Sequence, residues 1–232
     1  MKLIEKDIQQ TIEEIYLIET FNLNDKTILE LGCGAASMTK KIASNGFGRN
    51  IIACEVDEIQ HLKNLELDIE NVEFKLCGAQ DIKVDDNSID FIFMFKSFHH
   101  IPKEFMEKSL SEIKRVLKPN GLAYISEPLF DGEQNELIAM FHDEEEVRIN
   151  AFEAIKKAVE DDELKLFKEL FFQTEIQYKS FEDFEKRQMH LTYNDDKITE
   201  ELKKEIEEKF ESFGGSNRVF LKPFRVDILQ KI

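Results

Sequence analysis

Short, continuously apolar segments alternate with amphipathic ones through the first half of the chain, and this alternation constrains the fold more than any other feature. Apolar residues three or four apart predict helices at 36–44, 58–66 and 102–118. Segments that are apolar at nearly every position are typical of strands covered on both faces, as in a parallel sheet. These predicted strands cover residues 27–31, 50–55, 71–76, 89–95 and 122–126. The order of strands and helices therefore predicts an α/β fold with a doubly wound, mostly parallel sheet.

The segments outside this alternating region complete the expected domain. Strands at 172–178 and 219–229 predict an antiparallel pair that closes one end of a seven-stranded sheet. Apolar spacing predicts an N-terminal helix over 3–20, and further helices at 181–190 and 198–211. We expect a single domain over residues 1–232, consisting of an N-terminal helix (1–25), a cofactor-binding core (26–128), a helical cap or lid inserted after the fifth strand (129–170), and the remaining helices and closing strands (171–232).

The charge of the chain limits the partners that it can bind. It has 31 Lys and Arg residues against 48 Asp and Glu, a formal net charge of −17. Such an excess of acids disfavours nucleic acids and anionic membranes, since binding to both depends on clustered Lys and Arg. The acidic runs at 143–146 and 160–163 predict solvated faces. We therefore expect a small-molecule substrate, no nucleic acid and no membrane partner, and a monomer or homodimer.

The cysteines and the N-terminus indicate a cytoplasmic protein. Cys33, Cys54 and Cys77 are odd in number and lack metal-ligand spacing, which favours reduced thiols and no metal site. Acidic residues interrupt the apolar ones at the N-terminus, which argues against a signal peptide. No apolar run approaches the ~18 residues of a membrane span.

A glycine-containing turn after the first predicted strand is the strongest functional signal. Gly32 and Gly34 stand between that strand and the next helix, where glycine allows a sharp bend and close approach of a ligand to the backbone. Glu55 ends the second predicted strand, and a carboxylate there can accept the two hydroxyl groups of a ribose. Residues 77–81 follow the third strand and border the same crevice, because the carboxyl ends of parallel strands share one edge of the sheet.

Four motifs resemble those of class I S-adenosylmethionine-dependent methyltransferases, in particular the enzymes that methylate small molecules. They occur in the family's order over about residues 26–128: ILELGCG at 28–34, IIACEVDE at 51–58, VDDNSIDFIFMFKSFHHIP at 84–102, and EIKRVLKPNGLAYISEP at 112–128. The resemblance implies a Rossmann-like methyltransferase fold and S-adenosylmethionine as the cofactor. It also implies in-line displacement of the methyl group by a nucleophile of the acceptor.

The resemblance assigns roles to residues after each strand. Gly32 and Gly34 would wrap the methionine part of the cofactor, Glu55 would accept the ribose hydroxyls, and Ala79 and Gln80 would face the adenine. Many relatives have Asp at the position of Gly78, so the contact to the adenine amino group falls to Gln80, to Asp81, or to neither. The complete set of cofactor-binding candidates is Glu30, Gly32, Cys33, Gly34, Glu55, Val56, Ala79, Gln80, Phe95 and Lys96.

His99 and His100 are the candidate catalytic bases. Histidine titrates near neutral pH, and this pair follows the fourth strand, beside the expected position of the methyl group. Of the two, His100 matches the more regular family position. The alternative is that either residue caps the helix that begins at Pro102 or bonds the loop.

Three residues are candidates for binding the acceptor: Lys96, Arg148 and Tyr193. Lys96 could contact an acidic group of the acceptor, or it could pair with Glu30 or Glu127. An arginine such as Arg148 suits a substrate carboxylate because it can form two parallel hydrogen bonds. Other polar residues of the later segments could serve as well: His142, Tyr178, Arg187, His190 and Arg225.

Other functions are compatible with parts of this pattern. A nicotinamide-dependent dehydrogenase shares the Gly-x-Gly turn and the distal acid, but it lacks an equivalent of the block at 112–128. A catalytically silent S-adenosylmethionine-binding partner would be expected to show a degraded cofactor loop, whereas Glu30, Gly32, Gly34 and Glu55 are intact. An enzyme of this fold that transfers another group from the cofactor has no separate signature.

Overall fold

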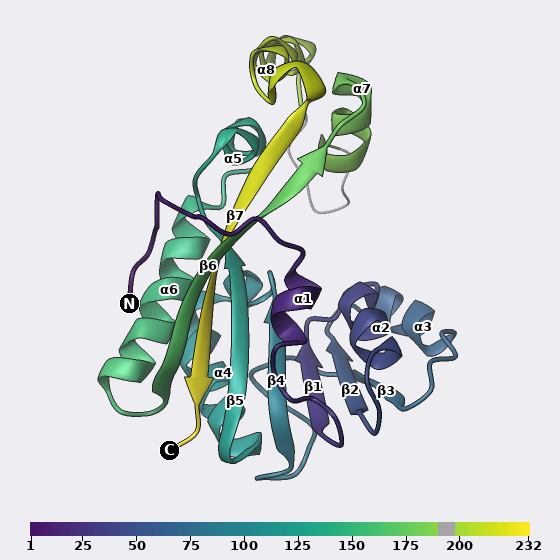
Figure 1. The fold of residues 1–232 in the computed structure, drawn as a ribbon, viewed down its shortest axis with the longest axis vertical. Helices are drawn as coiled ribbons and strands as arrows, with labels where there is room; N and C mark the ends of the chain where they lie inside the picture. The colour runs from purple at the N-terminus through teal and green to yellow at the C-terminus, as the bar shows by residue number, and fades with distance from the viewer. Residues whose placement is uncertain (190–197) are drawn as a thin grey trace.

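A seven-stranded mixed sheet forms the centre of the computed structural model, which describes residues 1–189 and 198–232 (Figure 1). The strand order is β3-β2-β1-β4-β5-β7-β6, in which β7 is antiparallel to both of its neighbours and the other pairs are parallel. The strands are β1 (Thr27–Leu31), β2 (Asn50–Glu55), β3 (Val72–Leu76), β4 (Ile89–Phe95), β5 (Leu117–Pro128), β6 (Lys165–Gln177) and β7 (Val219–Gln230). This arrangement confirms the predicted α/β fold and its antiparallel closing pair.

Helices cover both faces of the sheet because successive strand residues point to opposite sides. On β4, Ile92 packs with Ile113 of α4 and Ile155 of α6, whereas Phe93 lies in the core on the other face. The helices around the sheet are α1 (Glu14–Ile18), α2 (Ser37–Ser44), α3 (Glu58–Leu65), α4 (Lys103–Val116) and α6 (Glu145–Glu160). A short 3₁₀ helix, η1 (Phe98–His100), precedes α4. Burial on both faces explains why the strands are apolar at nearly every position.

A third cluster of buried side chains lies beyond the sheet. It surrounds the ends of β6 and β7, which project away from the other strands in Figure 1. We call it the aromatic cap; it consists of those strand ends with α5 (Glu133–Ala139), α7 (Phe181–Phe184), the π-helix η2 (Glu185–Met189) and α8 (Glu200–Ser212), followed by the 3₁₀ helix η3 (Gly215–Asn217). Phe184 and Phe210 pack together at 5.3 Å between ring centroids. Of the segment 129–170, α5 and the adjoining Met140 and Phe141 belong to this cap, whereas Ala151 and Ile155 of α6 are buried against the sheet.

The N-terminal helix is shorter than the sequence predicts. Helical structure is confined to Glu14–Ile18, whereas the apolar spacing predicts a helix over 3–20. Backbone groups of residues 10–12 bond instead to the edge strand β6: the Ile12 amide donates to the Gln173 carbonyl at 3.0 Å, and the Gln173 amide donates to the Gln10 carbonyl at 2.9 Å. These bonds satisfy backbone groups of β6 at the edge of the sheet, which would otherwise be unpaired. The stabilisation from this tertiary contact outweighs the local preference of residues 10–12 for a helix.

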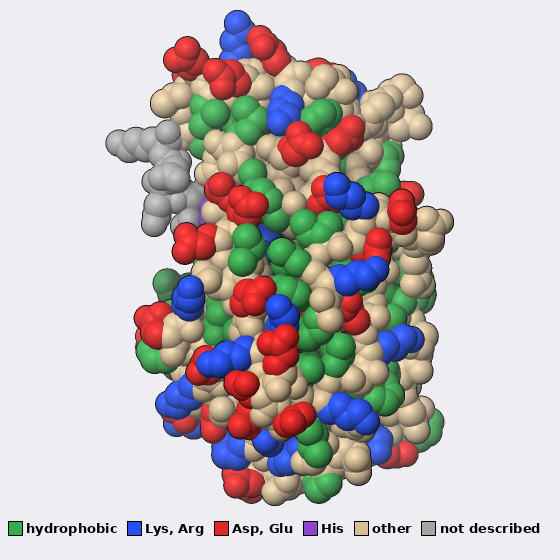
Figure 2. Space-filling model, turned by 90° about the vertical axis from the view of Figure 1, so that its left-hand side faces the viewer, with side chains coloured by type: hydrophobic (Ala, Val, Ile, Leu, Met, Phe, Trp, Pro, Cys, Tyr) green, Lys and Arg blue, Asp and Glu red, His purple; other side chains and the backbone are tan. Residues whose placement is uncertain are grey.

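The surface is mixed in charge on the face that Figure 2 shows. Acidic and basic side chains are interspersed there, so the net charge of −17 is not gathered into one patch on that face. No helix in the ranges 1–189 and 198–232 is both long and apolar enough to cross a membrane.

Candidate functional site

A crevice opens at the carboxyl ends of β1, β2 and β4. It lies where the strand order changes direction between β1 and β4, the usual position of a ligand in an open α/β sheet. The crevice has a volume of about 300 Å³, and its walls include Gly32, Glu55, Ala79, Gln80 and His100. These five residues, from four separate segments of the sequence, therefore lie together around one crevice.

The two glycines of the turn have different surroundings. Both have a positive φ, +73° at Gly32 and +51° at Gly34. A Cβ atom on Gly32 would lie 2.7 Å from Cβ of Ser97, so the loop after β4 packs directly against this residue. A Cβ atom on Gly34 would meet nothing within 4 Å. Gly32 thus permits close packing of two loops, whereas Gly34 leaves open space that a ligand can occupy.

Two polar side chains that the sequence analysis did not single out hold this turn in place. The buried Asn64 on α3 donates a hydrogen bond of 2.7 Å to the Gly34 carbonyl, and Ser97 donates one of 2.9 Å to the Leu31 carbonyl. Asn is a poor helix former, and its position inside the predicted helix 58–66 is the sequence signal that could have pointed to Asn64. The turn is consequently fixed from two sides before any ligand binds.

Glu55 is positioned by the backbone around it. Its carboxylate is largely buried and accepts hydrogen bonds from the amides of Gly34 and Val56, both at 2.7 Å, and of Asp57 at 3.0 Å. An ionised carboxylate offers about four acceptor positions, so about one remains for a ribose hydroxyl. Release of the Gly34 amide would provide a second position. The exposed side chain of Val56 borders the same crevice.

Glu30 lies behind the turn rather than in the crevice. Thr39 on α2 donates a hydrogen bond of 2.6 Å to its carboxyl group, and both residues are buried. Burial raises the pKa of Glu30 to about 7, although the Thr39 hydrogen bond and the charge of Lys96 act in the opposite direction. Glu30 therefore links the end of β1 to α2, and its role as a cofactor-binding residue stays a prediction.

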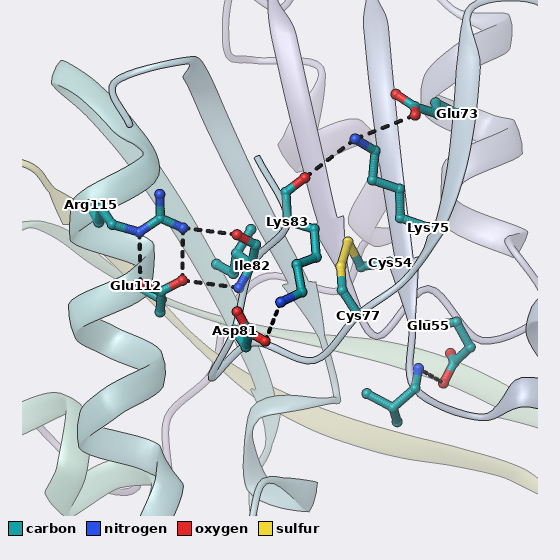
Figure 3. Close-up of a disulfide and its surroundings, with 11 residues drawn as sticks. Cys54, Glu55, Glu73, Lys75, Cys77, Asp81, Ile82, Lys83, Glu112 and Arg115 are labelled. Carbon is teal, nitrogen blue, oxygen red and sulfur yellow. Dashed lines mark hydrogen bonds and ion pairs between the residues drawn. A yellow bond between two sulfur atoms is a disulfide. The ribbon is translucent and has the colours of Figure 1, made fainter. Parts of the chain in front are cut away.

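A disulfide joins the ends of β2 and β3 at the wall of the crevice (Figure 3). It connects Cys54, which precedes Glu55, to Cys77, which borders the crevice, while Cys33 remains a buried free thiol. The expectation of three reduced thiols was therefore wrong for Cys54 and Cys77. The parallel register, in which Glu55 is opposite Leu76, brings the two cysteines together across 23 residues of sequence, and spacing along the chain does not reveal this.

The structure of the loop after β3 distinguishes Gln80 from Asp81 as the candidate for the adenine contact. Asp81 forms an ion pair with Lys83 on the surface, away from the crevice (Figure 3). By contrast, Gln80 lies in the crevice wall, and its side chain occupies the space that a Cβ atom on Gly78 would need. Of the alternatives left open by the sequence, Gln80 is thus the residue in reach of a ligand.

A second cavity lies between η1, α6, β7 and the aromatic cap. It has a volume of about 220 Å³, and its walls include Lys96, His100, Phe141, Glu144, Arg148 and Lys222. His100 borders this cavity and the crevice, so the two spaces meet at its ring. The geometry offers a place for two different ligands with one imidazole at their boundary.

His99 and His100 differ in environment although their rings are only 4.0 Å apart between centroids. Burial favours the neutral form of His99, yet the Glu127 carboxylate bonded to Nδ1 and the Glu144 carboxylate 3.6 Å from Nε2 raise its pKa to about 9. His100 is accessible from the cavities, and partial desolvation and the charge of His99 lower its pKa. His99 is thus held as an imidazolium, whereas His100 is neutral near pH 7 and can accept a proton.

His99, His100 and Glu144 also meet the geometric condition for a metal site. Their potential ligand atoms all lie within 4.8 Å of one another. A histidine must be neutral to coordinate a metal ion, and the two carboxylates that flank His99 favour its protonated form. The expectation of no metal at this site stays a prediction.

Of the remaining candidates, Lys96 lies at the second cavity, whereas Phe95 lies in the core. Lys96 borders the second cavity and pairs with the buried Glu14 at 3.8 Å, rather than with Glu30 or Glu127. Phe95 is in the core, stacked on Phe93 at 5.4 Å, and its ring does not border the crevice. Arg187 forms an ion pair with Asp183, and Arg225 forms one with Asp227. Tyr178 is buried in the core of the aromatic cap. His190 and Tyr193 fall within 190–197, outside the described residues.

Two charged residues of the second cavity escaped the sequence analysis. Glu144 belongs to an acidic run that predicts a solvated face, but it is largely buried and bonds to Arg148 at 2.6 Å. Lys222 stands among apolar residues of the last strand, and a lysine in such a strand was the signal that could have marked it. The positions of Glu144 and Lys222 in the cavity depend on how α6 and β7 pack around the loop after β4. Local sequence patterns do not predict such packing.

Comparisons with known proteins agree with this geometry. The family model Methyltransf_11, a methyltransferase domain, matches residues 29–125. An uncharacterized methyltransferase of Schizosaccharomyces pombe is 35% identical over 107 residues, which are 46% of this chain and 41% of that protein. The chain thus matches less than half the length of this curated relative.

Solved structures share the fold over nearly the whole chain. A S-adenosylmethionine-dependent methyltransferase from Aquifex aeolicus has a TM-score of 0.58 at 18% identity, covering 94% of this chain and 88% of that one. The [4+2]-cyclase SpnF has a TM-score of 0.60 at 14% identity, covering 98% and 84%. Because a cyclase shares the architecture, the fold alone does not determine the reaction, and the chemistry must be argued from the site.

Proposed function

We propose that this chain is a class I S-adenosylmethionine-dependent methyltransferase that transfers the methyl group of S-adenosylmethionine to a small-molecule acceptor. The match of residues 29–125 to a methyltransferase-domain model supports this proposal. The observation that carries the proposal is the meeting of the crevice and the second cavity at His100. One space suits the cofactor and the other suits an acceptor, with a proton-accepting group between them.

The crevice has the features that the cofactor requires. In this proposal, the open space at Gly34 would receive its amino-acid part, Glu55 would accept hydrogen bonds from the ribose, and Gln80 would contact the adenine. S-adenosylmethionine, when bound, supplies a methyl group that an aligned nucleophile can displace from its sulfonium. The protein contributes alignment of the acceptor and exclusion of water, which are the main sources of acceleration for such a reaction.

His100 is the proposed base for an acceptor that must lose a proton. It lies at the boundary of the two spaces, and it is neutral near pH 7, so its ring can accept a proton from the acceptor. His99 is bonded on both sides and has no such capacity. Its proposed role is to fix the position of η1, which carries both residues.

The experiment uses the full chain and S-adenosylmethionine with a deuterated methyl group, mixed with a low-molecular-mass metabolite extract. Mass spectrometry should detect a labelled product and S-adenosylhomocysteine. The variant His100→Gln should bind S-adenosylhomocysteine as tightly as the wild type in calorimetry but turn over about 10²-fold more slowly, the lower end of general-base contributions. His61→Gln, in a residue of α3 outside both spaces, is the matched control.

Three outcomes would change the proposal. Cofactor binding without any labelled product over a broad extract would favour the silent binding partner. Appearance of a different group from the cofactor in the product would favour transfer of that group instead. Full turnover by His100→Gln at every pH would reject the base role while leaving methyl transfer intact.

A further inference from the structure

The second cavity gathers positive charge in a protein that is strongly acidic overall. Lys96 lies in the loop after β4, Arg148 lies on α6, and Lys222 lies on β7. These residues come from three separate parts of a chain that has a formal net charge of −17 as a whole. Their convergence on a space of about 220 Å³ is therefore a property of the fold and not of the composition.

The partners of these cations leave an excess of positive charge. Arg148 is held by Glu144 at 2.6 Å, by Asn135 at 2.8 Å and by the Leu129 carbonyl at 3.1 Å, so its guanidinium has a defined position. Lys96 is paired with Glu14 at 3.8 Å.

Lys222 has no ion pair with any residue in the ranges 1–189 and 198–232, although its side chain is only partly exposed. Burial and the charges of Lys96 and Arg148 lower its pKa to about 8.

The two lysines stand close to one aromatic ring. The ammonium groups of Lys96 and Lys222 both lie 5.5 Å from the centroid of the Phe224 ring, which stabilises each of them weakly. Among residues 1–189 and 198–232, Glu144 is the one carboxylate in the wall of this cavity, and His99 and Arg148 share it. Partly buried cations are normally balanced by a nearby anion, and the described residues do not supply enough negative charge here.

We infer that the acceptor carries an anionic group, a carboxylate or a phosphate, which binds between Lys222, Lys96 and Arg148. This inference rests on the proposed function and adds the chemical class of the acceptor to it. Arg148 offers a planar, anchored donor, whereas the lysines offer mobile point charges, a combination that suits either anion. The small cavity limits the acceptor to a compact molecule whose nucleophilic atom faces His100.

The test uses the full chain saturated with S-adenosylhomocysteine, at constant ionic strength. Acetate and methyl phosphate are the anionic probes, and acetamide is the uncharged analogue of acetate. Binding is followed by thermal unfolding and by calorimetry. We expect at least one anion to raise the melting temperature and acetamide to leave it unchanged. The stronger of the two probes then distinguishes a carboxylate site from a phosphate site.

Two lysine substitutions distinguish anion binding at this site from non-specific attraction of anions to the protein. Lys222→Gln should weaken binding of the preferred anion at least tenfold while leaving the affinity for S-adenosylhomocysteine unchanged. Lys204→Gln removes an exposed lysine of α8 and should change neither affinity.

Equal stabilisation by acetamide, unaltered anion affinity in Lys222→Gln, or no anion binding at all would overturn the inference. Failure of S-adenosylhomocysteine to bind would instead count against the proposed function.

Discussion

The protonated His99 between two glutamates leads to a pH dependence of stability that can be calculated. The pKa of His99 is raised from 6.5 to about 9 by Glu127 and Glu144. At about 1.36 kcal/mol per pKa unit, this difference amounts to roughly 3 kcal/mol. Because the folded state holds the proton more tightly than the unfolded state, this stability is fully present below pH 6.5 and is lost as the pH rises to about 9.

The assay is urea unfolding between pH 6 and pH 9.5, for the wild type and for Glu127→Gln. The contribution of His99 to the unfolding free energy of the wild type should fall by about 3 kcal/mol over that window. In the variant the pKa of His99 should fall toward its ordinary value, so most of the loss should vanish. Other groups with shifted pKa, such as Glu30 near 7 and Lys222 near 8, are common to both proteins and cancel in the comparison.

Direct titration of the imidazole provides the decisive reading. In NMR spectra, the ring protons of His99 should titrate near pH 9, and those of His100 below 6.5. Parallel stability curves for the two proteins, together with a His99 pKa near 6.5, would refute the assignment of His99 as an imidazolium. In that case the distinction between a positioning histidine and a proton-accepting one would fail.

Three further predictions concern the crevice. Glu55→Gln should weaken S-adenosylhomocysteine binding about tenfold or more in calorimetry, because hydrogen bonds to a charged group are worth ~1.5–3 kcal/mol; an unchanged affinity would remove Glu55 from the site. Gly34→Ala should lower the free energy of unfolding by about 1 kcal/mol, because Gly34 has a positive φ, and the added methyl group should also obstruct the ligand. Gly32→Ala should lower it further, because the new Cβ atom also meets Ser97. Equal unfolding curves for the two variants would contradict this packing. Under denaturing, non-reducing conditions, alkylation should label Cys33 alone, and labelling of all three cysteines before reduction would show that the Cys54–Cys77 bridge is absent.

The central elements of the fold could be predicted because their signal is local. Strands such as β1 and β4 are apolar at nearly every position, and the turn at Gly32 and Gly34 follows directly from the sequence. The crevice could be predicted as well, since the carboxyl ends of parallel strands must share an edge. The sequence consequently predicts that residues at or after the ends of those strands, such as Glu55 and Gln80, border one crevice, and both do.

The parts that escaped prediction depend on contacts between distant segments. The N-terminal residues have helical spacing, but the open edge of β6 captures their backbone near Thr11. Lys222 and Glu144 meet in one cavity only because β7 and α6 approach the loop after β4. The bridge between Cys54 and Cys77 arises from the register of two strands. Local periodicity contains no information on any of these three pairings.

A crystal structure of the chain with S-adenosylhomocysteine would test the central claim most directly. We expect the adenosyl group in the crevice between Glu55 and Gln80, the amino-acid part at Gly34, and the sulfur atom facing His100 and the second cavity. A dinucleotide retained in the crevice, or the ligand bound elsewhere on the protein, would contradict it.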